Sequence, residues 1–188
     1  MTKYKKMRKN IEIEFRSRFD VKKYKELKKF LDVNAKDLGE DDKDVYFFLL
    51  PDKLLKTVNN VSKKTAKIVL KLTKIGKGSD FEEIEVPINQ SDFEKTSKIF
   101  TALHLCDNMH SFQKRHNYLY KGVELALKWS GPWGYHLELE VVIHDKNKKQ
   151  FAEKKIFSVA KELGVKIMSD KELKSFTQKA EADYKKIK

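Results

Sequence analysis

The sequence predicts an α+β fold built on eight antiparallel β-strands with flanking helices. Segments of strand character outnumber helical ones, and several alternate apolar and polar residues with a period of two. Turn residues such as Pro51 and Asp52, or Gly131 and Pro132, separate them at short intervals, which suits hairpins rather than parallel strands joined by crossovers. We expect strands at residues 11–19, 44–50, 53–60, 65–75, 80–88, 111–120, 122–130 and 135–144.

Four helical patterns interrupt or follow these strands. Residues 21–38 predict an amphipathic helix, with one apolar face formed by Tyr24, Leu27, Phe30 and Leu31. The chain shows no internal repeat and no linker typical of a domain boundary, so we expect a single domain over residues 1–188, with helices of 150–187 on or beside the strands. The other helices are expected at residues 91–105, 150–163 and 170–187.

The composition indicates a globular protein with polyanionic partners. The 188 residues are 40% hydrophobic, which is enough for a substantial core, and the formal net charge is +13. This charge favours nucleic acid, nucleotides, polyphosphate or an anionic membrane surface. The single cysteine, Cys106, excludes an intramolecular disulfide and a cysteine-based zinc site. No apolar run approaches the roughly 20 residues that span a bilayer, so we expect a soluble, cytoplasmic protein without a membrane partner.

The first predicted strand, IEIEFRSRF, carries its charges on one face. Successive side chains of a strand point to opposite faces, so Glu12, Glu14, Arg16 and Arg18 share a side. Other predicted strands also combine an apolar face with a face crowded by acids and bases. Eight antiparallel strands can close into a barrel, and the charged face would then line its interior. Because buried charges are costly unless they are paired or neutralised, such an interior implies a charged guest.

Three Glu-x-Glu pairs stand on predicted strands. Carboxylates two residues apart on a strand lie about 7 Å from each other, and they suit a hard cation such as Mg²⁺ or Mn²⁺. Any one pair is more often an exposed strand face; three pairs on three strands shift the balance toward a site. The pairs are Glu12 and Glu14, Glu83 and Glu85, and Glu138 and Glu140.

Basic residues recur on the same strands. Arginine binds phosphate oxygens with two parallel hydrogen bonds, whereas lysine acts as a point charge, so bases opposite acids suggest a site for phosphate and metal. Lysine is simply abundant in this chain, and that explanation is weaker for the arginines. The basic ends, 3–9 and 179–188, lack interleaved aromatic residues and are expected to be solvated tails. The bases considered are Arg16, Arg18, Lys56, Lys67, Lys71, Lys114, Arg115 and Lys128.

The order of these motifs resembles the CYTH domains, also called triphosphate tunnel metalloenzymes. EIEFR at the first strand is similar to the family's ExExK signature, with arginine in place of lysine. DVYFF, KIVLKL followed by EEIEV, QKRHNY and WGYHLELE resemble the later family motifs in the same order along nearly the whole chain. Family members include class IV adenylyl cyclases and thiamine, inorganic and RNA triphosphatases.

The resemblance implies a closed eight-stranded antiparallel β-barrel whose charged tunnel holds a triphosphate and a divalent metal, Mg²⁺ or Mn²⁺. It predicts a metal-dependent phosphohydrolase acting on ATP, thiamine triphosphate or tripolyphosphate. The alternatives are an adenylyl cyclase and a non-catalytic binder of nucleotide, polyphosphate or RNA, with nucleic acid a secondary partner; we expect a monomer or homodimer. The implied catalytic and metal residues are Glu12, Glu14, Glu138 and Glu140, and the implied phosphate-site residues are Arg16, Arg18, Lys56, Lys71, Glu83, Glu85 and Arg115.

Three positions depart from the family pattern. Gln113 stands where the family has a lysine, with Lys114 shifted onto the next position, and the arginine-rich LRxR strand is reduced to LLKTV. Lys128 stands where an acidic residue precedes the closing strand. Replacing an acid by a base should weaken a second metal site, because a unit charge at about 4 Å is worth several kcal/mol at intermediate dielectric.

Overall fold

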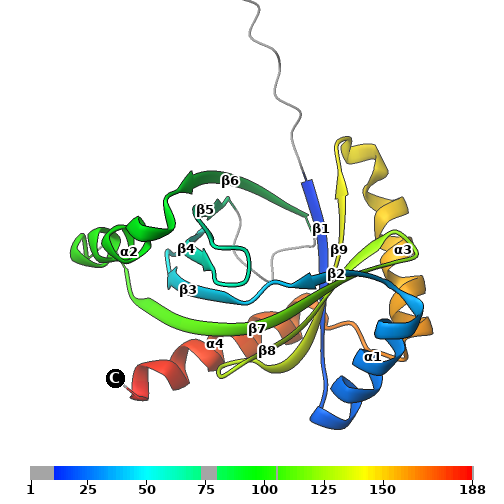
Figure 1. Ribbon diagram of the computed structural model, residues 1–188. Helices are drawn as coiled ribbons and strands as arrows, with labels where there is room; N and C mark the ends of the chain where they lie inside the picture. Colours follow the sequence, from blue (N-terminus) through cyan, green and yellow to red (C-terminus); the bar gives the residue numbers. More distant parts are fainter. Residues whose placement is uncertain (1–10, 73–79, 105, 188) are drawn as a thin grey trace, which may run out of the picture.

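The computed structural model describes residues 11–72, 80–104 and 106–187, which form nine strands and four α-helices (Figure 1). The basic N-terminal segment 3–9 lies outside the described residues. The strands are β1 (Ile11–Arg18), β2 (Lys36–Glu40), β3 (Lys43–Phe48), β4 (Leu54–Asn60), β5 (Thr65–Lys71), β6 (Asp80–Ile88), β7 (Asn108–Tyr120), β8 (Val123–Ser130) and β9 (Gly134–Ile143). The helices are α1 (Val21–Asn34), α2 (Phe93–Ala102), α3 (Lys149–Glu162) and α4 (Asp170–Ile187), with 3₁₀ turns at Gln90–Asp92 and Lys146–Lys148.

Eight of the strands close into an antiparallel barrel. The sheet runs β7-β3-β4-β5-β6-β1-β9-β8, and β8 pairs again with β7, which completes the ring. The predicted eight-stranded closed barrel with flanking helices is therefore confirmed. The ninth strand, β2, pairs with β7 outside the ring.

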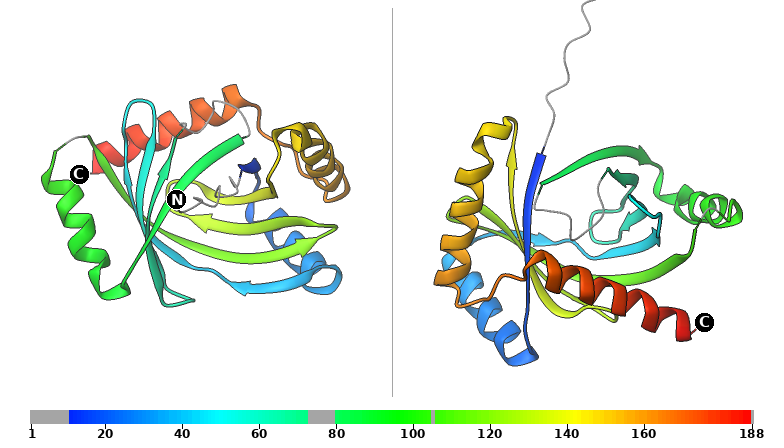
Figure 2. Two further views of the ribbon diagram at one scale, coloured as in Figure 1. Left: turned by 90° about the horizontal axis from the view of Figure 1, so that it is seen from above. Right: turned by 180° about the vertical axis from the view of Figure 1, so that it is seen from behind.

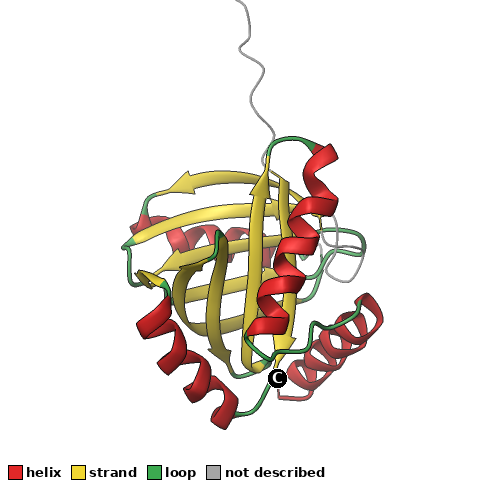
Figure 3. Cartoon of the chain, turned by 90° about the vertical axis from the view of Figure 1, so that its right-hand side faces the viewer, coloured by secondary structure: helices red, strands yellow, loops and turns green. Residues whose placement is uncertain are grey.

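The main hydrophobic core lies outside the barrel, between its wall and two helices. Leucines at alternate positions of β8 and β9, such as Leu127 and Leu137, are fully buried on the outer face. They pack with Leu31 of α1 and Ile156 of α3, and Figure 3 views the side of the barrel that these helices cover. Since the apolar residues of β1, β8 and β9 point outward to this core, their alternate, charged residues must point inward.

The other two helices pack elsewhere on the barrel. On α2, the Ser97 hydroxyl lies 2.7 Å from the Thr57 hydroxyl of β4. α4 is the red helix of Figure 2. Its Phe176 makes an edge contact with Trp133, and its Thr177 and Glu181 line the cavity of the barrel. No described helix has both the length and the apolar character needed to cross a membrane.

The helix predicted over residues 21–38 ends earlier, so that part of the prediction is wrong. α1 stops at Asn34, and residues 36–40 form β2. The backbone of these residues pairs with β7, from Lys36 opposite Leu119 to Glu40 opposite His116, and this pairing replaces further helical hydrogen bonds. The strand predicted over 65–75 ends at Lys71, and 73–75 lie outside the described residues. The helix predicted over 91–105 spans Phe93–Ala102, and residue 105 is not described.

Candidate active site

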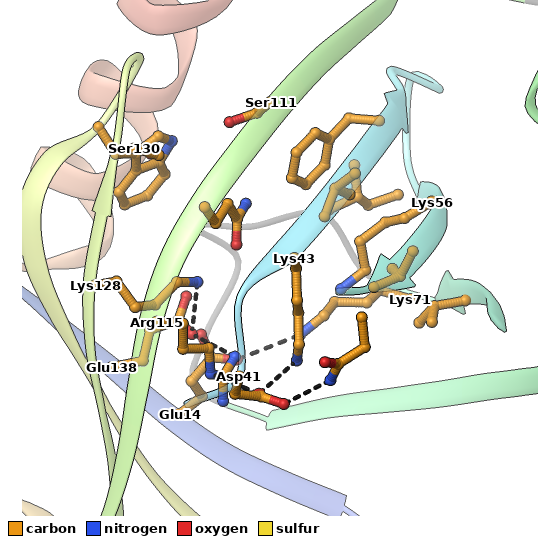
Figure 4. A pocket seen from close by; sticks show the side chains of 18 of the residues that line it. Glu14, Asp41, Lys43, Lys56, Lys71, Ser111, Arg115, Lys128, Ser130 and Glu138 are labelled. Atoms are coloured by element: carbon orange, nitrogen blue, oxygen red, sulfur yellow. Dashed lines mark hydrogen bonds and ion pairs between the residues drawn. The ribbon is translucent and has the colours of Figure 1, made fainter. Parts of the chain in front are cut away.

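The barrel encloses a cavity of about 460 Å³ that is lined mainly by charged and polar side chains (Figure 4). All eight strands of the ring contribute to this lining, and α4 adds Thr177 and Glu181. The charged face that alternation predicted for IEIEFRSRF thus points inward at Glu12, Glu14 and Arg16. We call this cavity the tunnel.

Three carboxylates meet on one side of the tunnel. Glu12 and Glu14 come from β1 and Glu140 from β9, where Glu14 and Glu140 are directly paired. One oxygen from each lies within 4.8 Å of the others. Burial, together with the neighbouring carboxylates, raises the pKa of Glu12 to about 7 and that of Glu140 to about 8. We call these three residues the acid cluster.

The acid cluster fits a hard divalent cation. Its donors are oxygens only, which is the ligand type preferred by Mg²⁺ and Mn²⁺. The pKa values of Glu12 and Glu140 are raised first by burial and then by neighbouring carboxylates, and at Glu12 the Lys71 charge offsets only part of this, so the cluster needs further positive charge for compensation. A divalent cation would supply that compensation.

Lys71 of β5 contacts two carboxylates of the acid cluster, Glu12 and Glu14, together with Glu83 of β6. Its Nζ lies 2.6 Å from Glu83, 3.3 Å from Glu14 and 3.7 Å from Glu12. Its side chain is only 5% exposed. Burial disfavours the ammonium charge, but the carboxylates of Glu14 and Glu83 outweigh burial and raise the pKa of Lys71. Lys71 is therefore a permanent cation that fixes the carboxylates on β1 and β6.

Glu138 is set apart from the acid cluster and is surrounded by cations. Its Oε1 accepts a hydrogen bond from Arg16 Nε at 3.2 Å, and its Oε2 lies 3.1 Å from Lys128 Nζ and 3.5 Å from Arg115 Nη1 (Figure 4). Burial opposes ionisation, but the charges of Lys128 and Arg16 hold the pKa of Glu138 well below its usual range. The structure thus brings together three of the four predicted metal ligands.

Two buried cations of the tunnel are short of partners. Arg16 Nη1 is buried without a hydrogen-bond partner among the described residues, although Nη2 of the same side chain pairs with Glu14. Lys56 of β4 makes no ion pair with any described side chain, and burial with the nearby Lys71 charge lowers its pKa to about 8. A guanidinium nitrogen without a hydrogen-bond partner and an ammonium without an ion pair are expected where an anion binds.

Arg115 and Glu85 also line the tunnel. Arg115 Nε lies 3.1 Å from Asp41 Oδ2 and donates to Asn117 Oδ1 at 2.7 Å, which orients its guanidinium. Glu85 pairs with Lys67 on β5, and both side chains are more than a third exposed, at 43% and 38%. This pair therefore lies at the water-accessible edge of the site.

Arg18 lies outside the tunnel. Its guanidinium stacks on the ring of Phe176 at 3.8 Å, and its Nε donates to the Trp133 carbonyl at 3.0 Å. It lines a separate cleft with residues of α4, including Lys171 and Lys179. β1 ends at Arg18, where Phe176 of α4 packs against this side chain. Arg18 therefore does not enter the tunnel, although it has the same place in the alternation as Arg16.

Several lining residues were not predicted from the sequence. Asp41 Oδ2 lies 3.0 Å from Lys43 Nζ, and its Oδ1 lies 3.0 Å from Lys63 Nζ. The period of two in β3 leads back from Val45 to Lys43, so extending the predicted strand by one residue would have found this lysine. His136 is buried in the tunnel wall, with Nδ1 donating to the Gly134 carbonyl at 2.9 Å. The spacing of the histidines in the sequence did not predict that His136 would line the cavity.

Of the family departures, Gln113 and Lys128 line the tunnel, while Lys114 points outward. Lys114 Nζ lies 2.8 Å from Asp42 and its side chain is 63% exposed. Lys114, which stands one position after the lysine of the family pattern, therefore does not line the tunnel.

Comparison with known proteins identifies the family. A profile of the CYTH domain matches residues 10–175, which is most of the chain. The chain belongs to the CYTH domain family. No curated protein matches the sequence. Proteins of this family are metal-dependent, and membership supports the binding of a triphosphate.

Solved structures share the fold. A conserved hypothetical protein from Pyrococcus furiosus is 26% identical, with a TM-score of 0.68 over 84% of this chain and 94% of its own. A protein from Pyrococcus horikoshii is also 26% identical, with a TM-score of 0.67 over 86% and 99% of the two chains. A Hippeastrum protein, described as a candidate adenylyl cyclase with a dominant triphosphatase activity, is 16% identical, with a TM-score of 0.57 over 84% and 89%. The last similarity concerns the fold alone.

Proposed function

We propose that this protein is a divalent-metal-dependent phosphohydrolase that acts on a triphosphate bound in the tunnel. The observation that carries the proposal is the pairing of two features in one cavity. The acid cluster is only partly compensated by Lys71 and Arg16, while Arg16 Nη1 has no hydrogen-bond partner among the described residues and Lys56 makes no ion pair with a described side chain. A triphosphate with a divalent cation supplies both charges at once.

The phosphate side of the site is formed by cations on three strands. Arg16 offers its unpartnered Nη1, and Lys56 offers its whole ammonium group. Arg115 is held in place by Asp41, and it faces the same cavity from β7. Cations fixed in advance in a cavity sheltered from water stabilise the charge of a phosphoryl group without reorganising during the reaction.

The metal side is formed by Glu12, Glu14 and Glu140. When bound there, Mg²⁺ or Mn²⁺ supplies a Lewis acid for the phosphoryl oxygens and orients water for attack. Lys71 maintains the carboxylates of Glu14 and Glu83 in position. These roles make the carboxylates ligands and the lysine a positioning residue.

A phosphate-release assay tests this function. Tripolyphosphate, thiamine triphosphate and ATP are each supplied with Mg²⁺ or Mn²⁺, and cyclic AMP is measured in parallel. We expect metal-dependent phosphate release that a chelator abolishes. Cyclic AMP formation in place of phosphate release would assign the site to an adenylyl cyclase, because attack by the 3′-hydroxyl of ATP needs the same phosphate and metal ligands. Tight binding without either product would assign it to a non-catalytic binder.

Two matched variants separate the acid cluster from the rest of the lining. Glu140→Gln is expected to lower phosphate release at least about 100-fold, equivalent to about 2.7 kcal/mol in the barrier. Glu124 lies opposite Glu140 on β8 and lines the same cavity, but it is not part of the acid cluster. Glu124→Gln should stay within a few-fold of the unmodified protein. Equal activities of the two variants would contradict the proposal.

A further inference from the structure

The inward carboxylates of β1 and β9 occupy two different electrostatic environments. Those of the acid cluster lie close to one another, with Lys71 beside Glu12 and Glu14 and no ion pair between Glu140 and a described side chain. Glu138 has three cations within 3.5 Å of its oxygens, namely Arg16, Lys128 and Arg115. Two residues on the same face of β9, Glu138 and Glu140, thus have opposite surroundings.

Both oxygens of Glu138 are already engaged. Oε1 accepts from Arg16 Nε, and Oε2 faces the Lys128 ammonium and the Arg115 guanidinium. A metal ion bound to Glu138 would have to displace these contacts and would stand beside three positive charges. At the acid cluster the penalty is smaller, because Glu140 makes no ion pair with a described side chain and Glu12 has one cation, Lys71, at 3.7 Å.

Lys128 is built into the tunnel wall. It lies on β8 between Arg115 of β7 and His136 of β9, its partners across the sheet. The side chain is 6% exposed and points into the cavity toward Glu138 (Figure 4). A buried ammonium is costly unless it is paired. Here its pairing with Glu138 leaves its positive charge directed at the space where the phosphates are proposed to bind.

We propose that the Lys128 ammonium takes the place of a second divalent cation, so that each chain binds one metal ion, at the acid cluster. Lys128 engages Glu138, which removes that carboxylate from the ligand set, and it contributes a fixed positive charge to the triphosphate. This inference rests on the proposed function, since it assigns the ions of that same site. It explains why a base stands where the family pattern has an acid.

Counting bound Mn²⁺ by equilibrium dialysis and electron paramagnetic resonance tests the inference without a substrate. The unmodified chain should bind one Mn²⁺ in the tunnel, with the spectrum of an isolated ion. Lys128→Glu removes the ammonium and restores an acid beside Glu138, so it should bind a second Mn²⁺. Two ions about 4 Å apart would give a spin-coupled spectrum. Lys63→Glu makes the same charge change at an exposed lining position paired with Asp41, and it should still bind one ion.

The possible outcomes distinguish the inference from the function. Two coupled ions in the unmodified chain would overturn the role of Lys128 and leave the phosphohydrolase in place. A single ion in Lys128→Glu, folded by circular dichroism, would also overturn it. Absence of bound Mn²⁺ from the unmodified chain would overturn the proposed function itself.

A second variant covers the case in which Lys128→Glu does not fold. Lys128→Gln removes the charge with a side chain of similar polarity. It should weaken tripolyphosphate binding about tenfold, as expected for one charge-assisted contact, while the Mn²⁺ count stays at one. An unchanged dissociation constant would overturn the inference.

Discussion

Lys71→Met is expected to destabilise the fold strongly, because it removes the cation that the buried carboxylates share. The Lys71 Nζ contacts Glu83, Glu14 and Glu12 at 2.6, 3.3 and 3.7 Å. Methionine has a side chain of similar length and apolar packing, but it removes the positive charge that Lys71 supplies to Glu12, Glu14 and Glu83. Removing one partner of a buried ion pair costs about 3–5 kcal/mol. For a chain of this length, that loss lowers Tm by roughly 6–20 °C.

The same strand offers a matched control. Lys67 lies four residues before Lys71 on the same face of β5, and it pairs with Glu85 at the exposed edge of the tunnel. Exposed ion pairs contribute about 0–1 kcal/mol. Lys67→Met should therefore change the free energy of unfolding by no more than about 1 kcal/mol.

Urea unfolding of both variants, with and without Mn²⁺, measures these effects. Mn²⁺ should stabilise Lys71→Met more than it stabilises the unmodified protein, because the ion replaces the missing positive charge and no longer competes with an ammonium. A loss below about 1 kcal/mol for Lys71→Met would refute the inference that Lys71 compensates the buried charges of Glu12, Glu14 and Glu83. Equal stabilisation of both proteins by Mn²⁺ would refute it as well.

Three further predictions concern the phosphate side. Arg16→Lys keeps the charge but loses the second arm of the guanidinium, so calorimetry should show tripolyphosphate binding at least about tenfold weaker, and equal affinity would contradict the role of Nη1. Lys56→Met should weaken tripolyphosphate binding while raising the free energy of unfolding at pH 7, because it removes an unpaired buried charge; a loss of stability would contradict this. This gain in the free energy of unfolding should shrink as the pH rises from about 8 toward 10, because native Lys56, with its pKa lowered to about 8, releases a proton there that the unfolded chain still binds. Urea titrations across that range measure the gain. A gain that stays constant with pH would refute the assignment.

The strand pattern predicted the barrel because alternation and turn residues are local properties. Each strand of the ring overlaps a predicted segment, and the side chains of IEIEFR face inward and outward as their polarity indicates. The extra strand β2 was missed because its residues, KDLGE, carry no alternation of their own. Their conformation is set by pairing with β7, a tertiary contact that the local sequence does not encode.

The sequence predicted that charged side chains point into the barrel, but it did not predict which of them form ion pairs with one another. The three Glu-x-Glu pairs look alike in sequence. The structure separates Glu138, which meets cations on β1, β7 and β8, from Glu140, which meets other carboxylates. Arg18 shares the pattern of Arg16, but it stacks on Phe176, which follows it by more than 150 positions in the chain. Such differences depend on which strands become neighbours, and spacing along one strand does not contain that information.

The most direct test of the site is a crystal structure with Mn²⁺ and tripolyphosphate, read by the anomalous scattering of manganese. We expect one manganese peak bound by carboxylates of Glu12, Glu14 and Glu140, with the phosphates extending toward Arg16 and Lys56. Manganese bound only outside the tunnel, or tripolyphosphate bound away from these cations, would contradict the proposal that the charged interior of the barrel is a metal-dependent triphosphate site.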